Sequence, residues 1–219
     1  MIANFQTSLE DVKTRLTDIS TGLLEANKLI LLALSNCDSA TFVQAKSHIK
    51  NISAKTDKID NTIIKILALY TPEARDLRQV IAYLKITNEL ARACTNTRSF
   101  VRGFTDVCID VDVATTAEYA LPMQTSTVKA IALTLSMINC NDEDEIKEIY
   151  NDVLIEENKT DDLYEMVERS LYQQAKDSND FEKFHKMLKA LRKSTKVATR
   201  AISIANLLVY AKVGGNFHN

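Results

Sequence analysis

Apolar residues recur at spacings of three and four along the first third of the chain, which is the period of one helix face. One run predicts a long helix whose inward stripe is Phe5, Leu9, Val12, Leu16, Ile19, Leu23, Ala26, Ile30, Ala33 and Cys37. A second run predicts another helix with the stripe Phe42, Ala45, Ile49, Ile52, Thr56, Ile59, Ile63, Ile66 and Tyr70. Between the two runs, Asn36 to Ser39 offer turn and N-cap chemistry. This part of the chain therefore predicts two long helices joined by a tight turn.

A proline marks the start of a third helix. Thr71 ends the second helix, because Pro72 disfavours the α conformation in the residue before it. Pro72 then suits the first helical position, where its missing amide costs nothing. The third helix is predicted from about Pro72 to about Arg102, with the inward stripe Leu77, Ile81, Leu84, Asn88, Ala91, Thr95 and Arg98 or Ser99. Three long helices joined by tight breaks predict an antiparallel three-helix bundle.

The second half of the chain is a diverged copy of the first at an offset of 104 residues. The matched pairs are Asp57 with Asp161, Asp76 with Asp180, Leu84 with Leu188, Lys85 with Lys189, Arg92 with Lys196, Thr95 with Thr199, and Ser99 with Ser203. Helices are predicted at about 116–139, 142–174 and 178–213, after an extended connection at 103–116, and the polar stretch 156–162 allows a break in the fifth helix. The duplication predicts an all-α fold of two tandem antiparallel three-helix bundles with six long helices, at 1–106 and 107–219.

Composition supports the helical prediction and narrows the function. With 4 Gly, 2 Pro and no Trp, few residues can punctuate β-hairpins. A net charge of −2, from 27 basic and 29 acidic residues, excludes a general attraction to nucleic acid or anionic lipid. The longest apolar runs, such as Leu29 to Leu34, are too short to span a bilayer, and the first residues do not resemble a signal peptide. We expect a cytoplasmic protein that is not an integral membrane protein.

The four cysteines do not predict a disulfide or a metal site. Cys37, Cys94, Cys108 and Cys140 form no CxxC pair and have no histidine at metal-ligand spacing. We interpret them as reduced thiols that pack as small apolar groups.

Four segments of the chain together are typical of one family. They are Asp57-Lys58-Ile59-Asp60, the run Thr-Pro-Glu-Ala-Arg-Asp-Leu-Arg at 71–78, the run 85–95, and the C-terminal run 206–217. In this combination the chain resembles the PhoU family of cytoplasmic phosphate-uptake regulators. The resemblance implies a protein that restrains a phosphate ABC-transporter ATPase and quiets a phosphate sensor kinase through protein contacts. It implies these motif residues: Pro72, Asp76, Leu77, Arg78, Arg92, Asp180 and Lys196.

The chain departs from the family where the family binds metal. The resemblance implies a Glu-x-x-x-Asp motif of metal-binding carboxylates, but the corresponding residues here are Ala91, Thr95, Thr195 and Thr199. Removing clustered acids removes the need for a cation, so we predict a bundle that folds without metal or other cofactor. The remaining candidates for a residual iron, zinc or magnesium site are Asp57, Asp60 and Asp161.

The sequence leaves alternatives for partners and function. The basic stripe Lys183, Lys186, Lys189, Arg192, Lys193, Lys196 and Arg200 is compatible with a solvated face or with an acidic partner surface. A helical adaptor that lost the phosphate role, a homodimer, and a metal-binding carboxylate bundle also remain as alternatives, although the bundle lacks Glu-x-x-His motifs. No nucleophile–base arrangement or phosphate-binding glycine loop is present, so we do not expect an enzyme.

Overall fold

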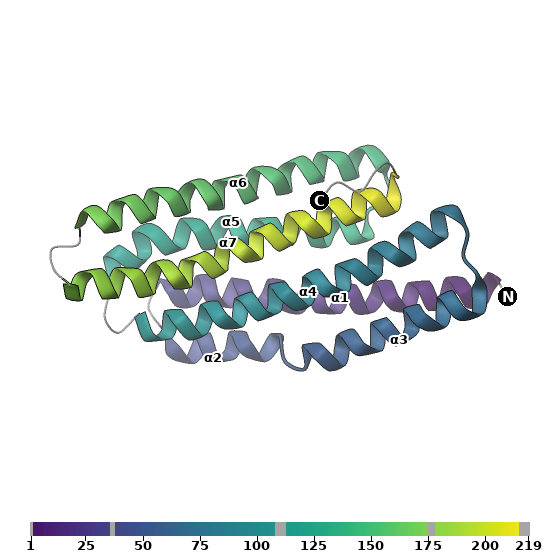
Figure 1. Ribbon diagram of the computed structural model, residues 1–219, viewed down its shortest axis with the longest axis horizontal. Helices are drawn as coiled ribbons and strands as arrows, with labels where there is room; N and C mark the ends of the chain where they lie inside the picture. The colour runs from purple at the N-terminus through teal and green to yellow at the C-terminus, as the bar shows by residue number, and fades with distance from the viewer. Residues whose placement is uncertain (1, 36–37, 108–112, 175–177, 215–219) are drawn as a thin grey trace.

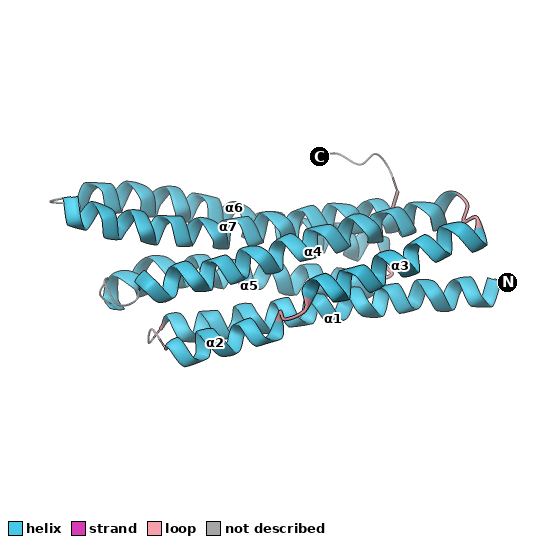
Figure 2. Cartoon of the chain, turned by 60° about the horizontal axis from the view of Figure 1, so that its bottom comes forward, coloured by secondary structure: helices cyan, strands magenta, loops and turns pink. Residues whose placement is uncertain are grey.

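The computed structural model describes residues 2–35, 38–107, 113–174 and 178–214, and every regular element in these ranges is an α-helix (Figures 1 and 2). The helices are α1 (Ile2–Leu34), α2 (Ser39–His48), α3 (Ile52–Tyr70), α4 (Ala74–Val107), α5 (Val113–Asn139), α6 (Glu143–Gln174) and α7 (Ser178–Lys212). The predicted all-α class is therefore confirmed. The three helices of the second half lie within one or two residues of the predicted ends at 139, 142–174 and 178–213.

The helices form two layers, and the helix axes of both layers lie along the long axis of the molecule. Helices α1 to α4 make one layer and α5 to α7 the other (Figure 1). The layers join mainly through α4 and α7, and also through α1 and α5. Helices α4 and α7 are antiparallel. Arg75 near the start of α4 contacts the carbonyl of Lys212 at the end of α7, while Gly103 near the end of α4 lies against Ala190 in the first half of α7. We propose that the boundary between the two repeats lies between α4 and α5, as the sequence predicts.

The predicted second helix is divided into α2 and α3, so the structure has seven helical segments where six were predicted. Asn51 adopts a left-handed backbone conformation with φ of 55°, which a continuous helix does not allow. Asp38 caps α2 as predicted, because its side chain accepts a hydrogen bond from the amide of Ala40. The last turn of α2 packs very closely on α1, where an added Cβ at Gly22 would lie 2.6 Å from the carbonyl oxygen of His48. The break therefore accompanies a close approach of two helices.

Three smaller expectations also differ from the structure. Pro72 lies two residues before α4, and the carbonyl of Glu73 accepts the amide of Asp76 as the helix begins. Helix α6 continues without interruption through 156–162. The extended connection predicted at 103–116 is wrong up to residue 107 and from residue 113, because α4 and α5 occupy those positions; the rest lies outside the described residues.

The inward stripe predicted for α4 is wrong. Leu77, Asn88 and Thr95 are exposed, and the side chains that α4 buries are instead Val80, Ala82, Tyr83, Ile86, Thr87, Leu90, Ala93, Cys94, Thr97, Phe100, Val101, Phe104 and Val107. Helix α4 contacts α1, α3 and α7 at once. A helix that is covered on several sides buries more than one stripe, so a single period does not identify its core face.

The core consists of two apolar clusters, and each draws residues from both layers. Buried polar residues form a plane, the polar plane, that crosses the helices between the two clusters. In α1, Asn27 separates Leu24 of one cluster from Ile30 of the other. The other members of the polar plane are Thr97 in α4, Gln124, Ser126 and Thr127 in α5, Glu156 and Thr160 in α6, and Ser194 and Thr195 in α7. The two layers therefore meet through both apolar packing and a polar plane.

Candidate functional site

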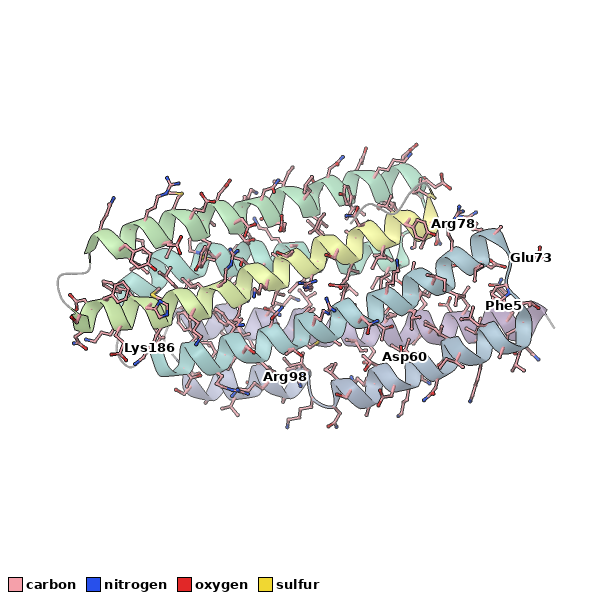
Figure 3. The ribbon with its side chains drawn as sticks, in the orientation of Figure 1. Phe5, Asp60, Glu73, Arg78, Arg98 and Lys186 are labelled. Atoms are coloured by element: carbon pink, nitrogen blue, oxygen red, sulfur yellow. The ribbon has the colours of Figure 1, made fainter. Side chains whose placement is uncertain are left out.

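Helix α3 carries the first pair of candidate carboxylates. Asp57 is exposed and Asp60 is half-buried. Figure 3 labels Asp60 on α3. Burial raises the pKa of Asp60, and the neighbouring charge of Asp57 raises it further. Asp60 Oδ1 is buried without a hydrogen-bond partner among the described residues. No donor of the described residues therefore compensates this oxygen.

In α4, Ala91 and Thr95 occupy positions where the resemblance implies acids. Thr95 Oγ1 donates to the carbonyl oxygen of Ala91 at 2.9 Å, one turn back in α4. The hydroxyl is thus satisfied within its own helix, as expected for threonine at such a position. Ala91 has no polar atom in its side chain. Neither residue therefore supplies an anionic ligand.

The corresponding carboxylates of the second half lie on α6, which contacts α7. Asp161 is exposed and forms an ion pair with Arg192 at 3.7 Å, and Arg192 also lies over the ring of Tyr164 at 4.9 Å. Thr199 Oγ1 donates to Glu157 Oε1 at 3.2 Å. Burial, followed by the charge of Asp161, raises the pKa of Glu157. Asp161 and Glu157 therefore have an arginine and a threonine of α7 as partners.

Sequence reasoning missed Glu157. The residue at the matching position of the first half is Ser53, so the internal repeat gave no signal for it. The only available signal was the spacing of four residues between Glu157 and Asp161, which places both on one face of α6.

The motif at the start of α4 contains one exposed apolar residue and one enclosed cation. Asp76 lies in the first turn, where its charge suits the helix dipole, and Asp180 has the same place in α7. Leu77 is 40% exposed. Arg78 Nε is buried with no hydrogen-bond partner in the described part of the chain, and the guanidinium lies against Gly214. No ion pair of Arg78 with an acidic residue is observed in the described part of the chain.

Comparison with known proteins assigns the first part of this architecture to a family. Residues 16–100 match the family model of the PhoU domain. The chain contains a PhoU domain. The matched residues include Asp57, Asp60, the motif at 72–78 and Arg92, whereas Asp161, Asp180 and Lys196 lie outside them. No curated protein matches the chain in sequence.

Solved structures extend the likeness to the whole fold. PhoU from Pseudomonas aeruginosa has 22% sequence identity and a TM-score of 0.84, over 96% of this chain and 100% of that one. The phosphate transport system regulatory protein PhoU from Streptococcus pneumoniae has 19% identity and a TM-score of 0.80, over 98% and 99%. A PhoU-like phosphate regulatory protein from Shewanella oneidensis MR-1 has 16% identity and a TM-score of 0.62, over 90% and 96%. At these identities the likeness establishes the fold, and it includes the half beyond the PhoU domain match.

The candidate carboxylates on α3 and α6 do not fit a metal centre. Within the ranges that the structure describes, no three His, Cys, Asp or Glu side chains lie close enough together to hold an ion. A divalent cation needs several converging oxygens, whereas Asp57 and Asp60 stand alone and Asp161 is paired with Arg192. We therefore assign no metal ligand to Asp57, Asp60 or Asp161.

We expect treatment with a chelator to leave the thermal unfolding midpoint unchanged, because no carboxylate cluster needs a cation to relieve its repulsion. Metal analysis and thermal unfolding before and after EDTA measure this. Ala91→Glu combined with Thr95→Asp, which adds two carboxylates to α4, provides the matched control and should make the midpoint sensitive to added divalent metal. Stoichiometric iron or zinc in the wild-type protein would contradict the expectation.

The basic stripe of α7 is partly neutralised. Lys186 pairs with Glu182 at 2.8 Å, and Arg200 crosses to Glu89 of α4 at 2.9 Å, where Arg92 also approaches at 3.7 Å. Lys196 is exposed on the same surface. Much of this charge therefore joins α4 to α7 or balances a neighbour, and the stripe is not a continuous positive face.

Leu77 and Phe181 hold equivalent places in the two halves, since 104 residues separate them. Leu77 is 40% exposed and Phe181 is 49% exposed, each in the opening part of its helix. Phe181 stacks on exposed Tyr172 with ring centres 5.8 Å apart, and on His185 at 6.2 Å. Each half of the protein thus exposes an apolar side chain at the start of its last long helix.

The described cysteines lie in different surroundings. Cys94 is fully buried, and burial raises the pKa of its thiol to about 12. Cys140 is half-buried beside Glu145. Both are free thiols, and Cys37 and Cys108 lie outside the described residues.

A helix long and apolar enough to cross a membrane is not found in the ranges that the structure describes.

Proposed function

We propose that this protein is a PhoU-like cytoplasmic regulator of phosphate transport and of phosphate-responsive signalling. The match of residues 16–100 to the PhoU domain carries this proposal. The fold supports it, because nearly the whole chain resembles a solved protein described as a phosphate transport system regulatory protein. In this proposal the protein acts by docking on the ATPase of a phosphate transporter or on a phosphate sensor kinase, and it carries out no chemical step.

The exposed residues support docking as the mechanism. An exposed apolar side chain contributes to a protein interface when it fills a pocket of the partner. Leu77 and Phe181 are such residues, they occupy equivalent positions, and exposed charges such as Arg92 and Lys196 lie on the same two helices. Because α4 and α7 are antiparallel, Leu77 and Phe181 lie near opposite ends of this helix pair, so a partner that contacts both must extend along the two helices. We propose that Leu77 and Phe181 contribute the apolar part of the docking surface.

We expect deletion of the gene to leave a phosphate-responsive reporter active in phosphate-rich medium, and the wild-type protein to restore repression. The double variant Leu77→Asp with Phe181→Asp should fail to restore it, because losing an apolar anchor weakens binding by about thirtyfold. Val43→Asp is the matched control, since Val43 is 65% exposed but lies on α2. Circular dichroism verifies that each variant folds. Repression unaffected by the deletion would contradict the proposed function.

One observation favours a second function. The positions of four expected metal-binding acids hold Ala91, Thr95, Thr195 and Thr199. A helical adaptor that has lost the phosphate role would show this change. It predicts that the protein still captures a partner from its own cells through Leu77 and Phe181, while the reporter is unaffected by deletion. Capture of the transporter ATPase together with loss of repression supports the regulator instead.

A further inference from the structure

A polar cavity of about 410 Å³ lies where the two layers meet at one end of the molecule. Its wall comes from the first turns of α1, the start of α4, the loop after α5 and the end of α7. Figure 1 shows the N-terminus of α1, the start of α4 and the end of α7 together at this end. A molecule bound in the cavity would therefore contact both halves of the protein.

Positive charge exceeds negative charge in this cavity. Of the described residues, three cations, Lys13, Arg75 and Lys212, line it with one carboxylate, Glu10. The acids Glu73 and Asp76 line a neighbouring hollow, which shares Gln6 with the cavity. Figure 3 shows Glu73 close to Phe5 at this end. A concave site with an excess of one charge concentrates ligands of the opposite charge. The cavity is thus suited to an anion.

The one carboxylate does not compensate its neighbour well. Lys13 Nζ lies 3.9 Å from Glu10 Oε1, beyond hydrogen-bond distance. The side chain of Lys13 is only 22% exposed, whereas that of Glu10 is 68% exposed. The cation is therefore enclosed while its counter-charge is largely solvated. A second anion beside Lys13 would give this ammonium the partner that enclosed charges need.

Lys212 adds an ammonium group, held in position by hydrogen bonds, to the same cavity. Its ammonium donates to the carbonyl oxygens of Met137, Ile138 and Cys140 at the end of α5, which uses all three of its N–H groups. Burial lowers the pKa of Lys212 to about 8, and the charge of Lys13 adds to this effect. Two ammonium groups that disfavour each other would both be stabilised by an anion between them.

Neutral and cationic donors remain available to a ligand. Among the described residues, Arg75 donates one long hydrogen bond, of 3.4 Å, to the carbonyl of Lys212, which leaves most of its five N–H donors without a partner there. Gln79 Nε2 donates to Tyr83 Oη at 2.9 Å, which leaves the phenol proton free to donate. Burial raises the pKa of Tyr83, so this proton is retained. A guanidinium, an ammonium and a phenol are the donors that bind phosphoryl oxygens.

We propose that this cavity binds a small phosphoryl anion through Lys13, Arg75 and Tyr83, with the ammonium group of Lys212 held beside them. The ligand is inorganic phosphate or the phosphate group of a small metabolite, which share this chemistry. The physiological importance of phosphate as the ligand rests on the proposed function, whereas the charge and geometry of the cavity do not. Because the lining comes from both layers, binding would also stabilise their association.

Calorimetric titration of the purified protein with inorganic phosphate, and separately with AMP, tests the site. We expect binding of at least one, and Lys13→Gln and Arg75→Gln should each weaken it by about tenfold, the scale of one lost charge-assisted hydrogen bond. Lys65→Gln removes the same charge from the exposed surface of α3 and should leave the affinity unchanged. Binding of phosphate alone identifies the free ion, and tighter binding of AMP identifies a metabolite.

Absence of binding by both ligands would overturn the proposal, and so would affinities that neither cavity substitution alters. Arg75 is exposed at the rim, so Arg75→Gln remains informative if circular dichroism shows that Lys13→Gln misfolds. The reporter assay separates this inference from the proposed function. If the protein binds phosphate but gene deletion does not affect the reporter, only the proposed regulatory function is contradicted. If the Arg75→Gln protein represses normally and binds as much phosphate as the wild type, only the anion site is contradicted.

Discussion

Replacing Gln124 with alanine is expected to lower the free energy of unfolding by about 2 to 4 kcal/mol, because it leaves several buried polar groups without partners. Gln124 Nε2 donates to the carbonyl oxygen of Asn27 at 3.1 Å and to its side-chain oxygen at 3.0 Å. Ser194 Oγ donates to Gln124 Oε1 at 2.9 Å. All three residues are at least 98% buried. Urea unfolding followed by circular dichroism measures the change.

Gln44→Ala is the matched control, because Gln44 is exposed in the middle of α2. It removes the same side chain without exposing a buried partner, and its effect should stay within about 0.5 kcal/mol. Equal effects of the two substitutions would show that water or a rearranged neighbour satisfies Asn27 and Ser194. Gln124→Leu should also destabilise, since it fills the volume but offers no hydrogen bond.

The reason for the large effect is the position of the network. Asn27 also donates to Thr97 Oγ1 at 3.3 Å, and Ser194 shares a hydrogen bond of 3.0 Å with Thr127. Four helices, α1, α4, α5 and α7, are thus joined in one plane between the two apolar clusters. Apolar contacts tolerate a shift along the helix axes, whereas these hydrogen bonds form at one register. We infer that the polar plane fixes how the two layers align.

The apolar period predicted helices well wherever one face is buried. Helix α1 buries the predicted stripe from Phe5 to Ala33, and α3 buries Ile59, Ile63 and Ile66 as expected. In α4 the same reasoning was wrong, because α1, α3 and α7 cover it from several sides. The buried Asn27 and Gln124 were also beyond this reasoning. A polar residue within an apolar pattern gives no sign of the partner it will meet on another helix.

The break in the predicted second helix had no signal in the sequence. No glycine or proline occurs between Phe42 and Tyr70, and Asn51 is one of several polar residues there. Its left-handed conformation is accessible to asparagine but is not dictated by it. The candidate site was predictable only within one helix. The spacing of Asp57 and Asp60 indicates that they share a helix face, while the pairing of Asp161 with Arg192 depends on how α6 and α7 meet.

Gly22→Ala is expected to destabilise the protein by about 1 to 3 kcal/mol, although alanine is the better helix former by about 1 kcal/mol. The added methyl carbon would lie 2.6 Å from the carbonyl oxygen of His48, which belongs to the backbone and has no rotamer to change. Relief requires that α2 move away from α1. That movement would disturb the buried residues of α2, Phe42 and Ala45, which pack in the core.

Thermal and urea unfolding of Gly22→Ala beside Thr21→Ala test this reasoning. Thr21 is the adjacent, exposed residue of α1, so its replacement by alanine improves helix propensity without a clash. Gly103→Ala offers a graded comparison, because its added Cβ would meet the side-chain Cβ of Ala190 at 3.3 Å and needs a smaller adjustment. We expect Gly22→Ala to be the least stable of the three. A Gly22→Ala protein as stable as Thr21→Ala would mean that α2 can shift freely, and that the close approach of α1 and α2 is not what confines the break to residues 49–51.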